Sequence, residues 1–187
     1  MSQFSNLWSD LATGPDAPRV IHVVVEIPKG SRNKYEYDTR LGLFMLDRVL
    51  YSPLHYPGDY GLIPQTLAED GDALDALVMV NEPSFSGCVI VARPLGLFRL
   101  IDKGVADNKV LAVPATDPLF SDYRSLRDVP RHFLAEVAHF FQIYKDLEGI
   151  GVSAIGWEPV EVAHETIEQA AQNYRSYASA RGDTVQA

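Results

Sequence analysis

Three carboxylates stand close together in the chain, at Asp70, Asp72 and Asp75. Because like charges this close repel one another, a chain that keeps them together is expected to place a cation between them. Carboxylate oxygens favour hard ions such as Mg²⁺, Mn²⁺ or Ca²⁺ over zinc, and Gly71 can adopt the positive φ of a tight loop. Taken alone, the motif fits a solvated acidic turn equally well, so the choice depends on the rest of the chain.

Further charged residues stand where strands are expected to expose them. Lys34, Glu36 and Asp38 alternate along one segment, so they share one face of a strand. Arg48 follows Asp47 between the apolar residues Leu46 and Val49, and it has the planar fork that binds phosphate in a bidentate manner. Glu26 ends an apolar segment. Strand alternation by itself is also compatible with a solvated face, where ion pairs contribute little.

Phenols and a second acidic loop complete the candidate chemistry. Tyr56 and Tyr60 stand at the two ends of a turn rich in Pro and Gly, and residues 101–109 hold Asp102, Asp107 and a terminal lysine. Both groups are suited to bind phosphate oxygens or cations. Zinc is not expected, because the paired positions His132 and His139 have no third nitrogen or sulfur ligand nearby in the sequence.

The elements that must position these residues follow from hydrophobic patterning. Between residues 20 and 114, short apolar segments alternate with Gly, Pro, Asn and Asp, which predicts a closed or nearly closed barrel. From Pro130 to Gly149 the period becomes helical, and a second amphipathic helix is predicted over residues 163–178. Strands followed by helices indicate an α+β domain. The predicted strands are residues 20–27, 34–38, 43–49, 73–80, 88–92, 96–101 and 109–113.

The whole chain limits the possible classes of protein. Its 187 residues, 47% of them apolar, predict one domain with a core, residues 1–18 being an irregular leader and 179–187 a tail. The net charge of −9 argues against a general nucleic-acid binder. A single cysteine, Cys88, excludes an intramolecular disulfide and fits a reducing, cytoplasmic setting. No secretory signal or membrane-spanning segment is expected.

Taken in order, these segments resemble the soluble family I inorganic pyrophosphatases. The resemblance extends from about Arg19 to Trp157 and rests on the order and spacing of several motifs rather than on any one. The motifs are Val24-Val25-Glu26-Ile27-Pro28, Lys34-Tyr35-Glu36, Asp47-Arg48, Tyr56-Pro57 with Tyr60-Gly61, Asp70-Gly71-Asp72 with Asp75, Asp102 with Asp107 and Lys109, and Ala138-His139-Phe140-Phe141 with Tyr144-Lys145-Asp146-Leu147-Glu148.

The resemblance implies a fold and an activity. The fold is a five-stranded, OB-like β-barrel with additional strands and two C-terminal helices packed against it. The activity is hydrolysis of pyrophosphate to two orthophosphates, dependent on several Mg²⁺ ions, with Mn²⁺ as a possible substitute. A homo-oligomer is implied, with a hexamer expected because bacterial members usually form one. Neither nucleic acid nor membrane is an expected partner.

The resemblance also implies a role for each matching residue. Asp72 matches the general base that accepts a proton from the attacking water. The implied metal ligands are Asp70, Asp75 and Asp107 for the tighter ions, Asp102 with Asp107 for an ion carried by the substrate, and Glu26 partly through water. The implied phosphate ligands are Lys34, Arg48, Tyr60, Tyr144, Lys145 and Lys109, with Glu36 and Tyr56 in supporting positions.

The chain departs from the family pattern at a few positions, none of which removes an implied ligand. Ala73 replaces a common proline, Val105-Ala106 replaces a more polar stretch, and Ile143 replaces a histidine that several bacterial members use in subunit contact.

Three other classes of protein are less compatible with this sequence than an enzyme. An EF-hand-like calcium loop fails because Asn81 stands where the closing glutamate belongs. A nucleic-acid-binding OB-fold predicts a basic groove, which the acidic balance opposes. A scaffold that has lost activity is not supported, because every implied ligand position holds a suitable residue.

Overall fold

Five strands form a closed ring in the computed structural model, which describes residues 6–181. The ring runs β1–β4–β5–β8–β6 and closes where β6 pairs with β1. All of these pairings are antiparallel except β5 with β8. The five-stranded barrel implied by the resemblance is therefore confirmed. The ring strands are β1 (Ile21–Ile27), β4 (Asp59–Leu62), β5 (Asp75–Val78), β6 (Val89–Asp102) and β8 (Lys109–Pro114).

Strand β6 is one long strand where the sequence predicts two. Pro94 lacks a backbone donor and suggests a break, but the register with β8 shifts between Pro94 and Gly96 and the strand continues. Its length allows β6 to pair with β1, β8 and β9 (Val152–Pro159), and with the short β7 (Val105–Ala106). The sequence patterns did not predict β9.

Strand β4 falls within a segment that the sequence suggests is a turn. It has only four residues, all of them buried. Gly61 explains how it fits: a Cβ at this position would lie 1.9 Å from the carbonyl oxygen of Val24 in β1. The close approach of the two strands therefore requires glycine, which sequence patterns interpret as a turn residue.

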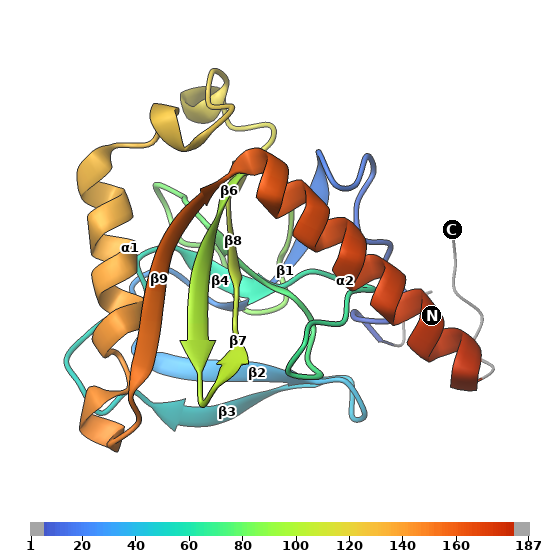
Figure 1. The fold of residues 1–187 in the computed structure, drawn as a ribbon, viewed down its shortest axis with the longest axis horizontal. Coiled ribbons are helices and arrows are strands. Elements are labelled where there is room, and N and C mark those ends of the chain that lie inside the picture. Colours follow the sequence, from blue (N-terminus) through green and yellow to red (C-terminus); the bar gives the residue numbers. More distant parts are fainter. Residues whose placement is uncertain (1–5, 182–187) are drawn as a thin grey trace.

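A separate two-stranded sheet lies beside the ring. Strands β2 (Asn33–Asp38) and β3 (Leu43–Val49) pair with each other and cross the lower end of the barrel (Figure 1). Lys34 and Glu36 form an ion pair, as expected for residues on one face of a strand. This sheet carries several of the predicted site residues toward the open end of the ring.

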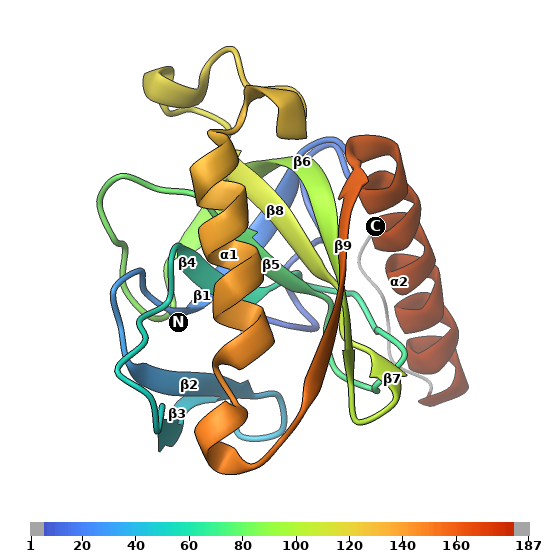
Figure 2. The same ribbon diagram turned by 60° about the vertical axis from the view of Figure 1, so that its left-hand side comes forward.

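Two helices flank the barrel. Helix α1 (Arg131–Ile143) lies against one side near β9, and α2 (Val160–Arg181) packs against β6 on another (Figure 2). Helix α2 begins before the predicted start and continues to Arg181, so the predicted tail is wrong for residues 179–181, whereas 182–187 lie outside the described residues. Within residues 6–181, no helix is both long enough and apolar enough to cross a membrane.

Residues 6–20 precede β1 and contain no regular element beyond one isolated bridge between Asp16 and Val20. This segment is fixed by Trp8, whose indole N–H donates to the carbonyl oxygen of Thr66 at 2.9 Å. The Trp8 ring also contacts Tyr174 of α2 edge-on, with centroids 5.0 Å apart. The leader thus ties α2 to the loop between β4 and β5.

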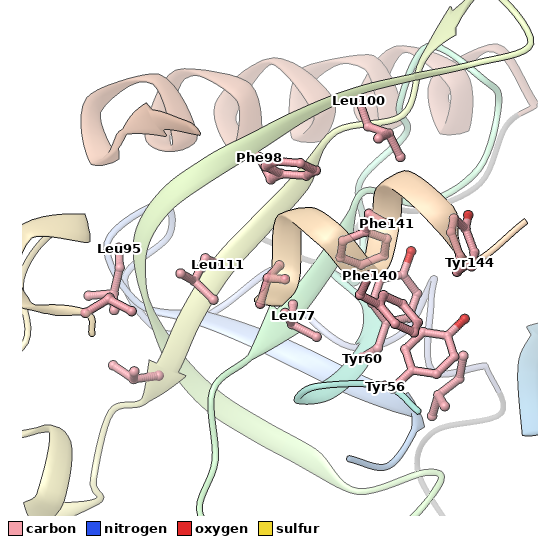
Figure 3. Packing of buried hydrophobic residues seen from close by; sticks show 14 of the residues in the cluster. Tyr56, Tyr60, Leu77, Leu95, Phe98, Leu100, Leu111, Phe140, Phe141 and Tyr144 are labelled. Atoms are coloured by element: carbon pink, nitrogen blue, oxygen red, sulfur yellow. The ribbon is translucent and has the colours of Figure 1, made fainter. Parts of the chain in front are cut away.

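An aromatic cluster joins α1 to the barrel. Phe140 lies 4.8 Å from Tyr56 between ring centroids, and Phe141 lies 5.9 Å from Tyr60. Figure 3 shows these rings packed together near Tyr144. All five rings are almost completely buried. The helical spacing of Phe140 and Phe141 therefore places both rings in one buried cluster, which also contains Tyr56, Tyr60 and Tyr144.

Candidate active site

One cavity of about 550 Å³ gathers almost all of the predicted site residues. They reach it from β1, β2, β4, β5 and the loop before it, the end of β6, the segment between β7 and β8, β8 itself and the residues that follow α1. Arg48 and Tyr56 are the two that do not line it. Those that line it are Glu26, Lys34, Glu36, Tyr60, Asp70, Asp72, Asp75, Asp102, Asp107, Lys109, Tyr144 and Lys145.

The acidic motif forms a tight loop on the cavity wall. Gly71 has a φ of 92°, and the N–H of Ala68 donates to the carbonyl oxygen of Asp72 at 2.7 Å. Asp70 accepts a hydrogen bond from the N–H of Asp72 at 3.1 Å. The loop ends where Asp75 begins β5. Its curl brings all three carboxylates to one cavity, as the motif predicted.

Lys109 lies between two of the predicted metal ligands. Its ammonium group pairs with Asp75 and with Asp107, while the lysine itself is only 3% exposed. The register explains one contact, because Lys109 in β8 is paired with Asp75 in β5. Burial alone lowers the pKa of Lys109, but the two carboxylates outweigh burial and raise it. Lys109 is therefore charged, and it balances the charges of the two carboxylates.

A second lysine plays a similar part at Asp102. The Lys145 ammonium group pairs with Oδ2 of Asp102. The other oxygen, Oδ1, is buried and has no hydrogen-bond partner among the described residues. A buried carboxylate oxygen without a partner is costly. A cation bound at this position would satisfy it.

Glu26 is the most deeply buried carboxylate of the cavity. Its Oε1 accepts the backbone N–H of Tyr37 at 2.7 Å. Burial, and next the charge of Asp75, raise the pKa of Glu26 to about 8. At neutral pH this group therefore holds a proton, which a bound divalent ion would displace.

Asp72 has the properties of a proton acceptor at the cavity mouth. Partial desolvation, followed by the neighbouring charges of Asp70 and Asp75, raises the pKa of its carboxyl group. Among the described residues, no cationic side chain forms an ion pair with Asp72. A carboxylate with a raised pKa and a free face is suited to accept a proton from water.

The tyrosines separate into two groups. The Tyr60 hydroxyl donates to Oδ2 of Asp75, and Tyr144 lines the same cavity. Burial first, and nearby carboxylates second, raise the pKa of both phenols, so they stay protonated and act as donors. Tyr56 lies beneath them, 2% exposed and 5.4 Å from the Tyr60 ring. Tyr56 therefore lies in the buried aromatic cluster beneath the cavity and does not form part of the cavity wall.

Arg48 does not line the cavity and is held by two carboxylates. Its Nε donates to Glu148 at 2.9 Å, and Nη1 pairs with Asp47. Asp47 also lies 3.3 Å from the Lys34 ammonium group, so one carboxylate connects two predicted phosphate ligands. Sequence reasoning gave Glu148 no role, because no local pattern signals a contact between residues this far apart.

Two cations at the cavity mouth were also missed as site residues. Arg40 and Lys103 line the cavity from two hairpin turns. The only available signal was Lys103 beside Gly104 in a hairpin turn, where lysine is not a favoured residue.

The donor set of the cavity fits a hard divalent ion. It consists of carboxylate oxygens, with one orphaned oxygen on Asp102 and one protonated carboxyl on Glu26. Within residues 6–181, no three His, Cys, Asp or Glu side chains are yet arranged to hold a metal ion together. The ion pairs explain this arrangement, since lysines occupy the space between carboxylates.

Comparisons with known proteins give one consistent result. Residues 23–175 match a family model described as inorganic pyrophosphatase. The chain is 52% identical over 158 residues to an inorganic pyrophosphatase of Halalkalibacterium halodurans, covering 84% of this chain and 97% of that protein. It is 49% identical over 170 residues to one of Haloferax volcanii, covering 90% and 96%. The crystal structure of inorganic pyrophosphatase from Thermus thermophilus superposes with a TM-score of 0.88 at 44% identity, covering 91% of this chain and 99% of that one.

Proposed function

Because this chain belongs to the inorganic pyrophosphatase family, it hydrolyses pyrophosphate to two orthophosphates, and we propose that it does so in the cavity just described with Mg²⁺ as its cofactor. The observation that carries the site is the convergence of carboxylates, lysines and phenols on one cavity. Members of this family depend on divalent metal ions. Bound ions supply positive charge against the substrate oxygens and lower the pKa of the attacking water.

The carboxylates have two proposed roles. Asp70, Asp75, Asp102, Asp107 and Glu26 hold the ions, which the orphaned oxygen of Asp102 supports. Asp72 accepts the proton of the attacking water at its carboxylate. Its raised pKa supports this role, because a stronger base accepts the proton more readily.

The cations and phenols hold the substrate. Lys34, Lys145 and Tyr144 donate to the phosphate oxygens, with Tyr60 and Lys109 deeper in the cavity. Donors fixed in position before the reaction stabilise the charge that develops in the transition state. Glu36 and Tyr56 support this set, Glu36 by pairing with Lys34 and Tyr56 by packing under Tyr60. Arg48 binds the leaving phosphate once it is released from Asp47.

Three further proposals concern the whole molecule. We propose that residues 1–187 form one pyrophosphatase domain, which the family match over residues 23–175 supports. A homo-oligomer, with six subunits by resemblance, is supported by apolar side chains exposed on the β2–β3 sheet, including Leu43 and Leu46. Light scattering after gel filtration tests the subunit number. A cytoplasmic location is supported by the single unpaired Cys88.

The test of the function is orthophosphate release from pyrophosphate. Rapid release is expected in Mg²⁺, loss of release in EDTA, and recovery when Mg²⁺ is restored. Mn²⁺ is tested in parallel. Absence of release by folded protein in either metal would contradict the proposed activity, and release that persists in EDTA would contradict the metal dependence.

A further inference from the structure

Two cations stand at the mouth of the cavity on the tips of two different hairpins. Lys103 lies in the turn between β6 and β7, and Arg40 lies in the turn between β2 and β3. Both hairpins reach the lower end of the molecule in Figures 1 and 2. The fold therefore brings a lysine and an arginine from distant segments to one rim.

The backbone at Lys103 is unusual for a lysine. Asp102 pairs with Val105, so Lys103 and Gly104 form a two-residue turn, with φ values of 50° and 85°. Positive φ at both positions defines a type I′ turn, which favours Asn, Asp or Gly. Among the described residues, Gln65 is the only other non-glycine residue with positive φ. A side chain held in an unfavoured conformation at the edge of an active site points to a function.

The rim cations also differ from the inner ones in their partners. Lys34, Lys109 and Lys145 are each paired with carboxylates. Lys103 forms no ion pair with any described carboxylate, and the Arg40 side chain is 90% exposed, with Asp38 at 3.8 Å. The charge of Lys103 is therefore not neutralised by a nearby carboxylate, whereas Arg40 forms an ion pair with Asp38 in which the arginine side chain stays exposed.

This charge matters because the protein as a whole repels an anion. Its formal net charge is −9, and much of the cavity wall is acidic. A polyanion that approaches the mouth meets Lys103 and Arg40 there. Local positive charge at an entrance raises the rate of productive encounter.

We propose that Lys103, assisted by Arg40, captures the diphosphate anion at the cavity mouth and raises kcat/KM without taking part in the chemical step. The inference rests on the proposed function, since it names how the same site obtains its substrate. Lys103 and Arg40 act while the substrate approaches the cavity, whereas the inner lysines, Lys34, Lys109 and Lys145, contact the substrate once it is bound.

The decisive variant is Lys103→Asn. Asn before Gly is the pair that type I′ turns favour, so the variant removes the charge and keeps the turn. We expect unchanged kcat and a kcat/KM lower by about fivefold at an ionic strength of about 20 mM. The difference should shrink below about twofold at 0.5 M, because the screening length falls to a few ångströms. Lys103→Glu should reduce kcat/KM further, and Arg40→Asn should have a smaller effect than Lys103→Asn, because Asp38 already offsets part of the charge of Arg40.

The matched control is Arg19→Asn. It removes the same charge from an exposed side chain of the leader, outside the cavity. We expect its kcat/KM to equal that of the wild type at both ionic strengths. An equal change in Arg19→Asn and Lys103→Asn would show an effect of net charge only and would overturn the proposal.

Other outcomes are equally clear. A Lys103→Asn variant with wild-type kcat/KM at low salt overturns the proposal, and one with a lower kcat shows a role in the chemical step instead. Calorimetric titration with methylenediphosphonate in Mg²⁺ provides a measurement that does not need turnover. Weaker binding by Lys103→Asn at low salt alone supports capture, and equal binding contradicts it. If the wild type binds this compound but releases no phosphate from pyrophosphate, the proposed function is wrong. The binding titration of Lys103→Asn still tests whether Lys103 captures the anion.

Discussion

Glu148 accepts a hydrogen bond from Arg48 at 2.9 Å, although one hundred residues separate them. Arg48 lies in β3, whereas Glu148 ends the short 3₁₀ helix η3 (Asp146–Glu148) that follows α1. The Glu148 side chain is only 10% exposed, so the contact is partly shielded from water. The short helix η3, which follows α1, therefore helps to fix the direction of an arginine on the β2–β3 sheet.

We expect Arg48→Ala to lower kcat/KM about 100-fold, because a guanidinium that stabilises transition-state charge is lost. Glu148→Gln keeps the shape but weakens the hydrogen bond, and we expect a loss of about threefold to tenfold. If Glu148 acts by positioning Arg48, the double variant is no worse than Arg48→Ala alone. Steady-state kinetics in Mg²⁺ measures all three variants.

The control for this pair is Arg99→Ala. Arg99 forms a similar pair with Glu158, at 3.1 Å, outside the cavity. Its kcat/KM should match that of the wild type. Losses from Arg48→Ala and Glu148→Gln that simply multiply would contradict the positioning role.

Asp72→Asn is expected to remove most turnover and to leave substrate binding. The amide cannot accept the proton of the attacking water, so kcat should fall by about 10²- to 10⁴-fold. Binding of methylenediphosphonate, measured by calorimetry, should stay within about threefold of the wild type. Asp122→Asn makes the same change at an exposed carboxylate outside the cavity and should leave kcat unaltered. Near-normal kcat in Asp72→Asn would remove Asp72 from the role of base.

Lys109→Met is expected to destabilise the metal-free protein. The substitution leaves Asp75 and Asp107 facing each other without their shared cation. Breaking a buried ion pair in this way costs about 3 kcal/mol. Mg²⁺ should restore more stability to the variant than it adds to the wild type, because an ion can then neutralise both carboxylates.

Urea unfolding in EDTA and in Mg²⁺ measures the effect of Lys109→Met. Lys29→Met is the control, since the ammonium group of Lys29 donates to the carbonyl oxygens of Val80 and Asn81 and forms no ion pair with a described carboxylate. It should show a smaller loss of stability and the same response to Mg²⁺ as the wild type. If Lys109→Met is as stable as the wild type in EDTA, the lysine does not hold the carboxylates together.

Glu26 predicts how the stability of the metal-free protein depends on pH. Its pKa is about 8 in the folded protein, against an ordinary value of 4.5. Between these values the folded state binds the extra proton, so the free energy of unfolding falls as pH rises. The slope from this one group is at most about 1.4 kcal/mol per pH unit. Below about pH 4.5 and above about pH 8, Glu26 contributes no slope.

Unfolding of the wild type and of Glu26→Gln in EDTA, at several pH values from 5 to 9, isolates this contribution. Glutamine cannot titrate, so the stability difference between the two proteins should change steadily up to about pH 8 and then become constant. A difference that does not vary with pH would show that Glu26 is ionised in the folded protein.

The acidic loop and the first helix were predictable because their signals are local. Asp70, Gly71 and Asp72 lie in one tight turn, where residue type and spacing limit the backbone directly. In α1, Val137 and Phe141 recur at helical spacing and are buried as that period requires. The five-stranded barrel was expected from the resemblance and is confirmed by the ring of pairings.

Strands β4 and β9 were not predicted, because the interactions that form them are not local in the sequence. β4 depends on Gly61, which lets it approach Val24, and β9 depends on pairing with β6 far along the chain. Neither has a strong pattern of its own. In both, a distant partner supplies the hydrogen bonds that make the segment a strand.

By itself, the sequence determined the chemistry available to this protein: which carboxylates, lysines and phenols exist, in what order, and hence which family it resembles. Only the tertiary structure decided how those groups pair. It placed Lys109 between Asp75 and Asp107, turned Arg48 toward Glu148, and brought Lys103 to the rim on a strained turn. The physical reason is that charge interactions depend on distance and burial in space, which the spacing of residues along the chain does not fix.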